Sequence, residues 1–544
     1  MRPTPSLPHA RPNPRKQPHI LFIITDQQRY DTIAALGHAH METPNLDRLV
    51  EEGVSLDRCY ITAPSCVPSR CSIFQGRYPH SAGVYKNGDT WTTSWVSSLA
   101  EAGYHCVNVG KMHTVPYAAQ AGFHERYVVE NKDRFLEGRY FFDEWDKALR
   151  ARGVVKQQRE SYRKRPDYRQ RMGAFTWDLD GDLQSDNFVG GFADWWLNTY
   201  PIEQPLFMQV GFPGPHPPYD PTPDWLERYL GKDLPIRDFS PAEIADQPEA
   251  MLALRKHMME VDHDSVVHVD NPTMEQRRYQ RACYLANVSM IDEQVGSILG
   301  ALEDKGILDD TVVIFTSDHG DCLGDHGHSQ KWNMYEEIVR VPAIIWFGRN
   351  VRGSLGPGLS APGSRSDALV STFDLGPTIL ELAGVEPPAE MEAISLLPLL
   401  GAASAGSAAG SAAGTSGMGT QPAQLKQPAS GATVAVGDAR WEIPVGRPLF
   451  ATPRDGREYV FAEHGRDNIL EGTEVLTMVR DKRWKLISYA EAGQGQLFDL
   501  EADPDERRNL WSDGAAQKEK SRLQEVLLSW YRNSLYHTRT TRRG

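Results

Sequence analysis

The run His19-Ile20-Leu21-Phe22-Ile23-Ile24-Thr25 decides the fold of this chain, and Asp26 follows it directly. A strand with one exposed face alternates apolar and polar residues, so an uninterrupted apolar run predicts a strand buried on both faces. Further strands of this kind are predicted at residues 105–109, 206–211, 312–316 and 343–347. Helical patterns lie between them, which predicts an α/β fold with a large mixed, mostly parallel sheet flanked by helices.

The helices between these strands have recognisable ends. Thr43-Pro44 is typical of an N-cap followed by proline in the first helical position, and Gly53 is expected to end that helix. The longest helix is predicted from residue 279 to residue 305, where apolar residues recur at helical spacing before Gly306. The strand at 312–316 follows, and polar residues come directly after it. Open α/β sheets place their ligand sites at such strand ends, which indicates an enzyme.

With 544 residues the chain is longer than one hydrophobic core usually supports, so a large domain and a smaller one are expected. We expect a disordered leader at residues 1–18, a catalytic domain at 19–400, a flexible low-complexity insertion at 401–445 and a smaller C-terminal domain at 446–544. In that last domain the pattern predicts an antiparallel sheet with strands at 459–462, 475–480, 484–488 and 496–500, followed by a helix near 519–531.

The composition argues against several partners and compartments. The formal net charge of −14 argues against binding to nucleic acid or to an anionic membrane, because both need a basic surface. No stretch reaches the ~18 consecutive apolar residues of a membrane span, and residues 1–18 lack the apolar stretch of a secretory signal. Six cysteines in so long a chain do not form a disulfide framework. We therefore expect a cytoplasmic protein, and its oligomeric state stays open.

The residues that carry chemistry begin with Cys66-Val67-Pro68-Ser69-Arg70. The following segment, through Gln75, suits a short helix that Gly76 ends. Cys66 then lies at the helix N-terminus, where backbone N–H groups favour an anion. An isolated cysteine is usually a buried and inert residue, so the interpretation of Cys66 depends on its neighbours.

Cys-x-Pro-Ser-Arg followed by the pair Gly76-Arg77 resembles the signature of the formylglycine-dependent sulfatases, which belong to the alkaline phosphatase superfamily. The resemblance implies an alkaline-phosphatase-like fold and the oxidation of Cys66 to formylglycine by a maturation enzyme. One hydroxyl of the hydrated aldehyde would attack sulfur and the other would then expel sulfate, which divides one hard step into two easier ones. A non-catalytic protein that binds sulfated ligands and keeps Cys66 unmodified is the alternative of another class.

Two further motifs follow predicted strands, Thr25-Asp26-Gln27 and Ser317-Asp318-His319. A single aspartate after a strand is commonly a turn residue or a helix cap, but two such pairs in one chain favour a shared site. The resemblance implies that Asp26, Gln27, Asp318 and His319 bind a divalent cation, with the converted Cys66 as fifth ligand. Oxygen ligands with one nitrogen suit calcium and also manganese. By the same resemblance, the cation polarises a sulfate oxygen and lowers the pKa of a formylglycine hydroxyl.

Cationic residues complete the predicted site. Lys111 and His113 stand in Gly110-Lys111-Met112-His113 after the predicted strand 105–109, His216 follows the strand 206–211, and Lys331 lies further along the chain. By resemblance, Arg70 and Lys111 contact the sulfate, and His113 takes a proton from the second diol hydroxyl. His216 and Lys331 would stabilise sulfate oxygens and the departing alcohol.

Other polar residues lie at the edge of this set or outside it. Asn87 is a weaker candidate for a substrate contact. His326 and His328 lie in a segment that also resembles the family, but a structural role fits them at least as well as a chemical one, so we leave them outside the site. Asp325 carries a carboxylate of the kind that binds cations, but the predicted metal shell is complete without it. The stretch 124–190 is rich in aromatic and basic residues, and is a candidate wall of the pocket or a solvated surface.

These motifs together predict a sulfatase that hydrolyses a small-molecule or saccharide sulfate ester to an alcohol and inorganic sulfate. The alternative in the same superfamily is a phosphonate monoester hydrolase or phosphodiesterase, which shares the cysteine signature and both aspartate pairs. Lys111-Met112-His113 favours the sulfatase, because relatives that prefer phosphorus esters generally carry neutral hydroxyl-bearing residues there. Loops set the alcohol part of the substrate, so the sequence leaves it open.

Overall fold

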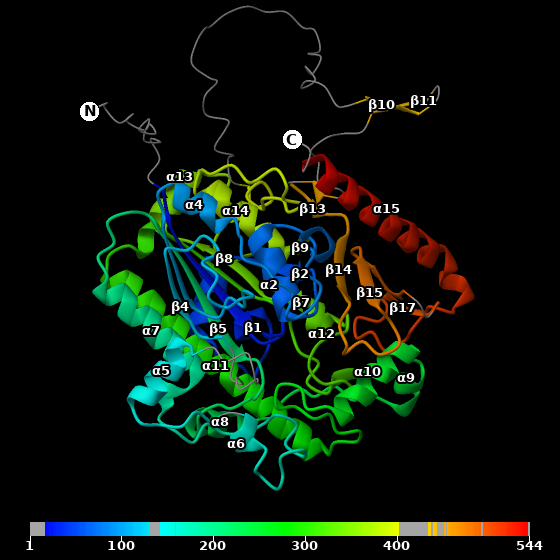
Figure 1. Cartoon of the computed structure of the whole chain (residues 1–544), viewed down its shortest axis with the longest axis horizontal. Helices are drawn as coiled ribbons and strands as arrows, with labels where there is room; N and C mark the ends of the chain where they lie inside the picture. Colours follow the sequence, from blue (N-terminus) through cyan, green and yellow to red (C-terminus); the bar gives the residue numbers. More distant parts are fainter. Residues whose placement is uncertain are drawn as a thin grey trace, which may run out of the picture.

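Helices lie on both sides of one large sheet in this protein, whose computed structural model is shown in Figure 1. The structure describes residues 17–130, 142–157, 159–401, 433–436, 439–442, 451–452, 454–490 and 493–541. The predicted leader and most of the predicted insertion therefore lie outside the described residues. Within the segment 401–445, the described residues include an antiparallel hairpin of β10 (Thr433–Val436) and β11 (Ala439–Glu442).

The large sheet is mixed and mostly parallel, as the sequence predicts. Its strands are β1 (His19–Asp26), β2 (Val54–Tyr60), β3 (His105–Gly110), β4 (Glu125–Val128), β5 (Leu206–Pro215), β6 (Thr311–Ser317), β7 (Arg340–Val341), β8 (Ala343–Phe347), β9 (Ser364–Ser371), β12 (Ala451–Thr452) and β13 (Gly456–Arg457). The strand order is β12-β13-β9-β2-β8-β6-β1-β5-β3-β4, and β7 pairs with β2. The run β6-β1-β5-β3-β4 is parallel throughout, whereas β8 is antiparallel to both of its neighbours.

β1 lies in the interior of this sheet, and all eight of its residues are buried. Ile20, Phe22 and Ile24 belong to one hydrophobic cluster, whereas Leu21 and Ile23 belong to another. Because successive side chains of a strand point to opposite faces, the two clusters cover the two faces of the sheet. The uninterrupted apolar run is thus explained by burial on both sides.

The predicted strands of the large sheet are found, and the strand predicted at 206–211 differs most from its predicted range. The pattern ended the strand at residue 211, because two prolines and a glycine stand among the next four residues. In the structure β5 continues to Pro215, and Asp26 pairs with Pro215 after a register shift in β1. The prediction was wrong at this end because the neighbouring strand supplies a pairing that the local pattern does not show. The extension brings His216 next to the end of β1.

The long helix predicted from residue 279 begins earlier, and the helix after Thr43 is confirmed. The helices that precede the small sheet are α1 (Pro44–Glu52), α2 (Cys66–Gln75), α3 (Pro79–Ala82), α4 (Val96–Glu101), α5 (Glu144–Ala151), α6 (Arg159–Tyr162), α7 (Ser185–Thr199), α8 (Pro223–Leu230), α9 (Pro241–Ala245), α10 (Glu249–Glu260), α11 (Met274–Asp304), α12 (Glu336–Val339), α13 (Arg349–Leu355) and α14 (Leu375–Leu382). α11 starts at Met274 because Thr273 and Gln276 form a capping box, in which each side chain accepts the other residue's N–H. Among the described helices, none combines the length and the apolar composition needed to cross a membrane.

A smaller antiparallel sheet lies in the C-terminal part of the chain, as predicted. It consists of β14 (Val460–Gly465), β15 (Val475–Arg480), β16 (Trp484–Tyr489) and β17 (Gly495–Asp499), paired in this order. The helix α15 (Gln517–Thr541) covers the outer side of this sheet (Figure 1). Leu523, Leu527 and Trp530 of α15 pack in one hydrophobic cluster with Phe461 and Val479. The predicted division of the chain into domains stays a prediction.

Candidate active site

Cys66 is the first residue of α2, and its side chain is buried. Ser65 precedes the helix in an extended conformation, and Gly76 ends it in the left-handed conformation at a φ of 66°. A Cβ at Gly76 would also lie 2.8 Å from Met391 Cγ, so the Met391 side chain would have to shift to admit it. α2 therefore has the ends that the sequence predicts, and it presents Cys66 at its N-terminus.

Two carboxylates and an imidazole surround the Cys66 side chain. Asp26 ends β1, and Asp318 and His319 follow β6; because these strands are parallel neighbours, the residues leave the sheet at the same edge. One potential ligand atom from each of Asp26, Cys66, Asp318 and His319 lies within 4.8 Å of the others, and all four residues are buried. The Cys66 sulfur is 3.1 Å from His319 Nε2 and 3.7 Å from Asp26 Oδ1. The structure thus brings together four of the five predicted metal ligands.

The donor atoms of this cluster suit a divalent cation. His319 Nδ1 lies 3.0 Å from the carbonyl oxygen of Gly320, so a proton on Nδ1 donates there and the Nε2 lone pair faces the cluster. Asp26 Oδ2 is buried and accepts no hydrogen bond from the described residues, although the Lys111 ammonium forms an ion pair with it. Carboxylate oxygens with one imidazole nitrogen form a donor set that calcium and manganese accept.

Gln27, the fifth predicted ligand, lies beside the cluster in a strained backbone conformation with a φ of 71°. Its N–H donates to Asp318 Oδ1 at 3.0 Å, and its carbonyl oxygen accepts from the Tyr284 hydroxyl at 2.7 Å. Its side-chain oxygen accepts from Lys331 Nζ at 2.8 Å, and its side-chain nitrogen donates to Asp321 at 2.6 Å. These bonds hold the strained residue in place, and its role as a ligand stays a prediction.

Arg70 and Lys111 are buried against the two carboxylates of the cluster. Arg70 Nε donates to Asp318 Oδ2 at 2.6 Å, and Arg70 Nη1 donates to the carbonyl oxygen of Lys111 at 2.9 Å. Burial alone would raise the pKa of Asp26, but Lys111 and other cations nearby hold this pKa well below its ordinary value. Asp26 is therefore ionised and available as a ligand.

The close approach of β3 and β5 positions Lys111. A Cβ added at Gly211 of β5 would lie 1.8 Å from the carbonyl oxygen of Lys111, so only glycine fits at residue 211. The N–H of Lys111 donates to the carbonyl oxygen of Gly211 at 2.7 Å. This contact turns the chain at the end of β3, where Gly110 has a φ of 90°.

Lys331 reaches the Cys66 sulfur from a loop between β6 and α12. Its Nζ lies 3.3 Å from Cys66 Sγ, and the side chain is buried. The residues on either side, Gln330 and Trp332, both have positive φ angles, of 59° and 74°. The N–H of Trp332 donates to the carbonyl oxygen of Pro64 at 3.2 Å, which ties this loop to the segment before α2. The loop therefore holds Lys331 beside Cys66, and its predicted contact with sulfate stays a prediction.

His216 and His113 lie in different surroundings. The His216 ring is buried, with Nδ1 2.7 Å from the carbonyl oxygen of Pro217 and Nε2 3.4 Å from Asp264 Oδ2. His113 has a φ of 62°, and its ring stacks on Tyr117 with centroids 6.1 Å apart. The described polar contacts of its backbone are with Glu130 and with the Trp91 indole. The predicted proton transfer by His113 stays a prediction.

Asn87 is exposed and lies at the N-terminus of α2. Its side-chain oxygen accepts hydrogen bonds from the Ser65 hydroxyl at 2.9 Å and from the Val67 N–H at 3.0 Å. Asn87 therefore caps the helix that carries Cys66 and lies beside the reactive position. Its predicted contact with substrate stays a prediction.

Sequence reasoning missed the residues that support this site. Asp321 Oδ2 accepts from the Tyr219 hydroxyl and from Gln27 Nε2, each at 2.6 Å. Tyr284 reaches Gln27 from the middle of α11. Two signals were available, because Asp321 stands two residues after His319 and Tyr219 three residues after His216, whereas Tyr284 follows no motif.

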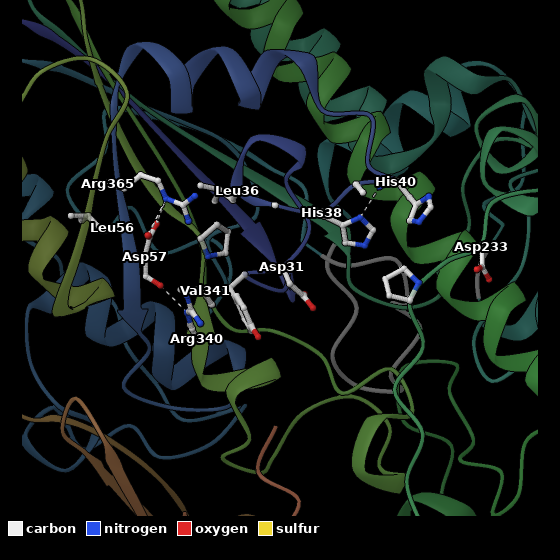
Figure 2. Close-up of a pocket in the computed structure, with 15 residues that line it drawn as sticks. Asp31, Leu36, His38, His40, Leu56, Asp57, Asp233, Arg340, Val341 and Arg365 are labelled. Carbon is white, nitrogen blue, oxygen red and sulfur yellow. Dashed lines mark hydrogen bonds and ion pairs between the residues drawn. The ribbon is translucent and has the colours of Figure 1, made fainter. Parts of the chain in front are cut away.

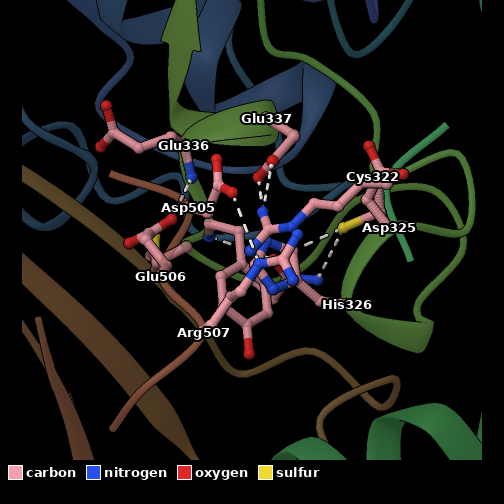
Figure 3. Close-up of polar contacts among 12 residues, drawn as sticks. Cys322, Asp325, His326, Glu336, Glu337, Asp505, Glu506 and Arg507 are labelled. Atoms are coloured by element: carbon pink, nitrogen blue, oxygen red, sulfur yellow. Dashed lines mark hydrogen bonds and ion pairs between the residues drawn. The ribbon is translucent and has the colours of Figure 1, made fainter. Parts of the chain in front are cut away.

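Asp325 and His326, which were left outside the site, belong to a buried polar network (Figure 3). Asp325 accepts from Arg29 at 2.8 Å and from Arg281 at 2.9 Å. The His326 ring stacks on Tyr335 with centroids 3.6 Å apart. His326, Glu337 and Glu506 bring potential metal ligands together, but Arg237 and Lys485 already pair with this group. Its contacts are those of a structural network.

A pocket of about 480 Å³ opens beside the loop after β1 (Figure 2). Tyr30, His38 and Asp233 line it together with Arg340 and Arg365. None of the predicted site residues lies in its wall. This pocket and the cluster around Cys66 are therefore different places in the molecule.

Comparison with known proteins agrees with the fold and with the motifs. A family model described as Sulfatase matches residues 18–385. The chain is similar to an arylsulfatase of Clostridium perfringens, with 26% identity over 535 residues that cover 94% of each chain. It is also similar to an N-acetylglucosamine-6-O-sulfatase of Bacteroides thetaiotaomicron, with 25% identity over 94% of this chain and 86% of the relative. Among solved structures, a phosphonate monoester hydrolase of Agrobacterium radiobacter has the same fold, with a TM-score of 0.70, 23% identity and coverage of 95% of this chain and 96% of that one.

Proposed function

Because the chain belongs to the sulfatase family, we propose that it hydrolyses a sulfate ester to an alcohol and inorganic sulfate with a nucleophile made from Cys66. The observation that carries this proposal is the position of Cys66. Its sulfur lies at the start of α2 among Asp26, Asp318 and His319, with the Lys331 ammonium 3.3 Å away. A helix N-terminus and a cation on the same side favour a bound anion such as sulfate.

In this proposal a maturation enzyme oxidises Cys66 to formylglycine, whose hydrate has two hydroxyls. One hydroxyl serves as nucleophile, and the other allows sulfate to leave when the aldehyde reforms. A thiol cannot take this second step, so unmodified Cys66 is a precursor only.

The proposed ligands of a divalent cation are Asp26, Gln27, Asp318 and His319, with the converted Cys66 as fifth ligand. Two observations support this assignment: Asp26 Oδ2 accepts no hydrogen bond from the described residues, and the Nε2 lone pair of the buried His319 faces the cluster. A bound calcium or manganese ion would supply Lewis-acid polarisation of a sulfate oxygen.

The remaining site residues stabilise negative charge or transfer protons. Arg70, Lys111 and Lys331 hold positive charge where negative charge spreads over the sulfate oxygens in the transition state. His216 donates a proton to the departing alcohol, and His113 accepts one from the second hydroxyl of the nucleophile. Because the lysines and the arginine are buried, their attraction for the sulfate is screened less than it would be in water.

Mass spectrometry of the Cys66 peptide, with a matched activity assay, tests the proposal. We expect the peptide from the native host to be lighter than its cysteine form, and we expect Cys66→Ala to abolish hydrolysis of an aryl sulfate. A Cys66 peptide that is entirely unmodified in active protein would contradict the nucleophile, and a protein inactive on every sulfate ester would favour the non-catalytic alternative.

A phosphonate monoester hydrolase or phosphodiesterase stays the second candidate, because a solved structure of that activity shares the fold over nearly the whole chain. The transition states of the two reactions are alike in shape and charge, so one site can serve both. Rates on an aryl sulfate, on several saccharide sulfates and on a phosphonate monoester decide between them. The relatives named for aryl and N-acetylglucosamine sulfates support both small-molecule and saccharide esters for this panel.

A further inference from the structure

Asp264 carries a carboxylate that the proposed reaction does not use, and it lies between two of the proposed site residues. Its Oδ2 is 3.4 Å from His216 Nε2 and 3.8 Å from Lys331 Nζ. The Asp264 side chain is 26% exposed, whereas His216 and Lys331 are buried. The carboxylate therefore lies at the open side of the site, against two buried cationic groups.

The turn that carries Asp264 is held in a strained conformation. Asp264 and Ser265 have φ angles of 52° and 67°, in the left-handed region that residues with a side chain seldom adopt. The carbonyl oxygen of His263 accepts a hydrogen bond from Gln330 Nε2 at 2.9 Å. Gln330 precedes Lys331, so the turn and the lysine loop are tied to each other. Strain that neighbouring structure maintains in this way is typical of functional positions.

Each nitrogen of the His216 ring has an acceptor oxygen in front of it. Nδ1 faces the carbonyl oxygen of Pro217 at 2.7 Å, and Nε2 faces the Asp264 carboxylate. A ring that donates from both nitrogens is an imidazolium. Burial and the Lys331 charge lower the pKa of His216, but Asp264 and Asp26 together raise it above its ordinary value. Without a carboxylate between them, two buried cations would repel each other.

We propose that Asp264 is a positioning residue, which orients His216 and keeps this histidine and Lys331 together as cationic donors beside the departing alcohol. This inference rests on the proposed function. When the bond between sulfur and the alcohol oxygen breaks, its electron pair goes to that oxygen. The His216 imidazolium shares its Nε2 proton between the Asp264 carboxylate and this oxygen, gives the proton to the oxygen and becomes a neutral imidazole. Asp264 stays ionised throughout, and His216 regains its proton from water.

The test is the dependence of the rate on the leaving group. An alcohol of high pKa needs the proton in the transition state, whereas a nitrophenolate leaves without it. For Asp264→Asn we expect kcat/KM to fall by roughly 10- to 100-fold with a high-pKa alcohol and to change little with nitrophenyl sulfate. Asparagine tolerates the left-handed backbone at residue 264, so the fold should persist. The measurement is kcat and KM over aryl sulfates of graded leaving-group pKa and a saccharide sulfate.

Asp262→Asn is the matched control, because Asp262 lies on the same turn but accepts its hydrogen bonds from Arg163 and Tyr168, at 2.8 Å and 2.7 Å. This variant should lower the rate by the same factor for every leaving group, or not at all. Asp264→Gly, which also suits a positive φ, is the second variant. Its kcat/KM should depend on the leaving-group pKa in the same way as that of Asp264→Asn.

Two outcomes separate this inference from the proposed function. A wild-type protein that hydrolyses none of these esters would contradict the proposed function. An active wild-type protein whose Asp264 variants lose the same factor with every leaving group, or lose nothing, would contradict the role of Asp264 alone.

Discussion

The Lys331 ammonium lies 3.3 Å from the Cys66 sulfur, although 265 residues separate them in the sequence. The same ammonium donates to the side-chain oxygen of Gln27 at 2.8 Å. Lys331 therefore joins the helix that carries Cys66 to the end of β1. It does so with a positive charge that is fully buried, which gives the charge a large effect on any anion bound there.

Lys331→Met should lower turnover of a sulfate ester by about a hundred- to a thousandfold, because one preorganised donor to the transition state is lost. The steady-state kcat, measured with thermal unfolding of the same sample, checks this. Lys482→Met is the control, because Lys482 is 59% exposed and pairs only loosely with Asp367, at 3.8 Å. A Lys331 variant with wild-type kcat would contradict the proposed role of this lysine in turnover.

Divalent cations should stabilise the wild-type protein and not an Asp26→Asn variant. A ligand that binds only the folded state raises the free energy of unfolding, and Asp26 contributes an ionised carboxylate to the cluster. The measurement is the thermal midpoint after chelator treatment, with and without added calcium or manganese. Asp309→Asn, at a half-exposed side chain, should respond like wild type. Equal stabilisation of Asp26→Asn would place the cation elsewhere.

Acid should destabilise the fold through His268. Burial, and then Arg255, lowers the pKa of this histidine to about 3. In the unfolded chain the pKa of His268 is near 6.5. Above that pH the histidine is neutral in both states, so its protonation costs the fold no stability there. As the pH falls towards about 3, unfolding takes up a proton, and stability decreases by about 1.4 kcal/mol per pH unit from this group.

Urea unfolding of wild type and His268→Gln between about pH 7.5 and pH 4, which covers most of the range from about 6.5 to 3, measures this contribution. The free energy difference between the two proteins should shrink as the pH falls. His40→Gln is the control and should parallel wild type. Parallel curves for wild type and His268→Gln would contradict the prediction.

Arg457→Met should cost about 3–5 kcal/mol of folding free energy, because it leaves a buried carboxylate unpaired. Arg457 is almost completely buried and donates to both oxygens of Asp374, at 2.7 Å and 2.5 Å. Arg365→Met is the matched control, since its pair with Asp57 is about half exposed on the arginine side and is worth about 0–1 kcal/mol. Equilibrium denaturation of wild type, Arg457→Met and Arg365→Met measures the loss of folding free energy in each variant. Equal losses in the two variants would contradict the prediction.

The sequence by itself determined the central strand and the reactive helix. Continuous burial on both faces leaves an uninterrupted apolar run, as in β1, and a helix is closed by bonds between residues three or four positions apart. Cys66 and Gly76 therefore mark the ends of α2 without reference to the rest of the chain. The aspartates after β1 and β6 were predictable for a related reason, since parallel neighbours end at the same edge of a sheet.

Only the tertiary structure decided which other groups reach this edge. Asp264 and Tyr284 belong to no motif, and they reach the site from a strained turn and from a long helix. Asp321 follows the motif at residues 317–319, but the motif does not show that its carboxylate reaches Gln27 and Tyr219. The extension of β5 to Pro215, which places His216, depends on pairing with β1 rather than on the local pattern. The physical reason is that these contacts join residues far apart in the sequence, and no local periodicity records which of them packing will bring together.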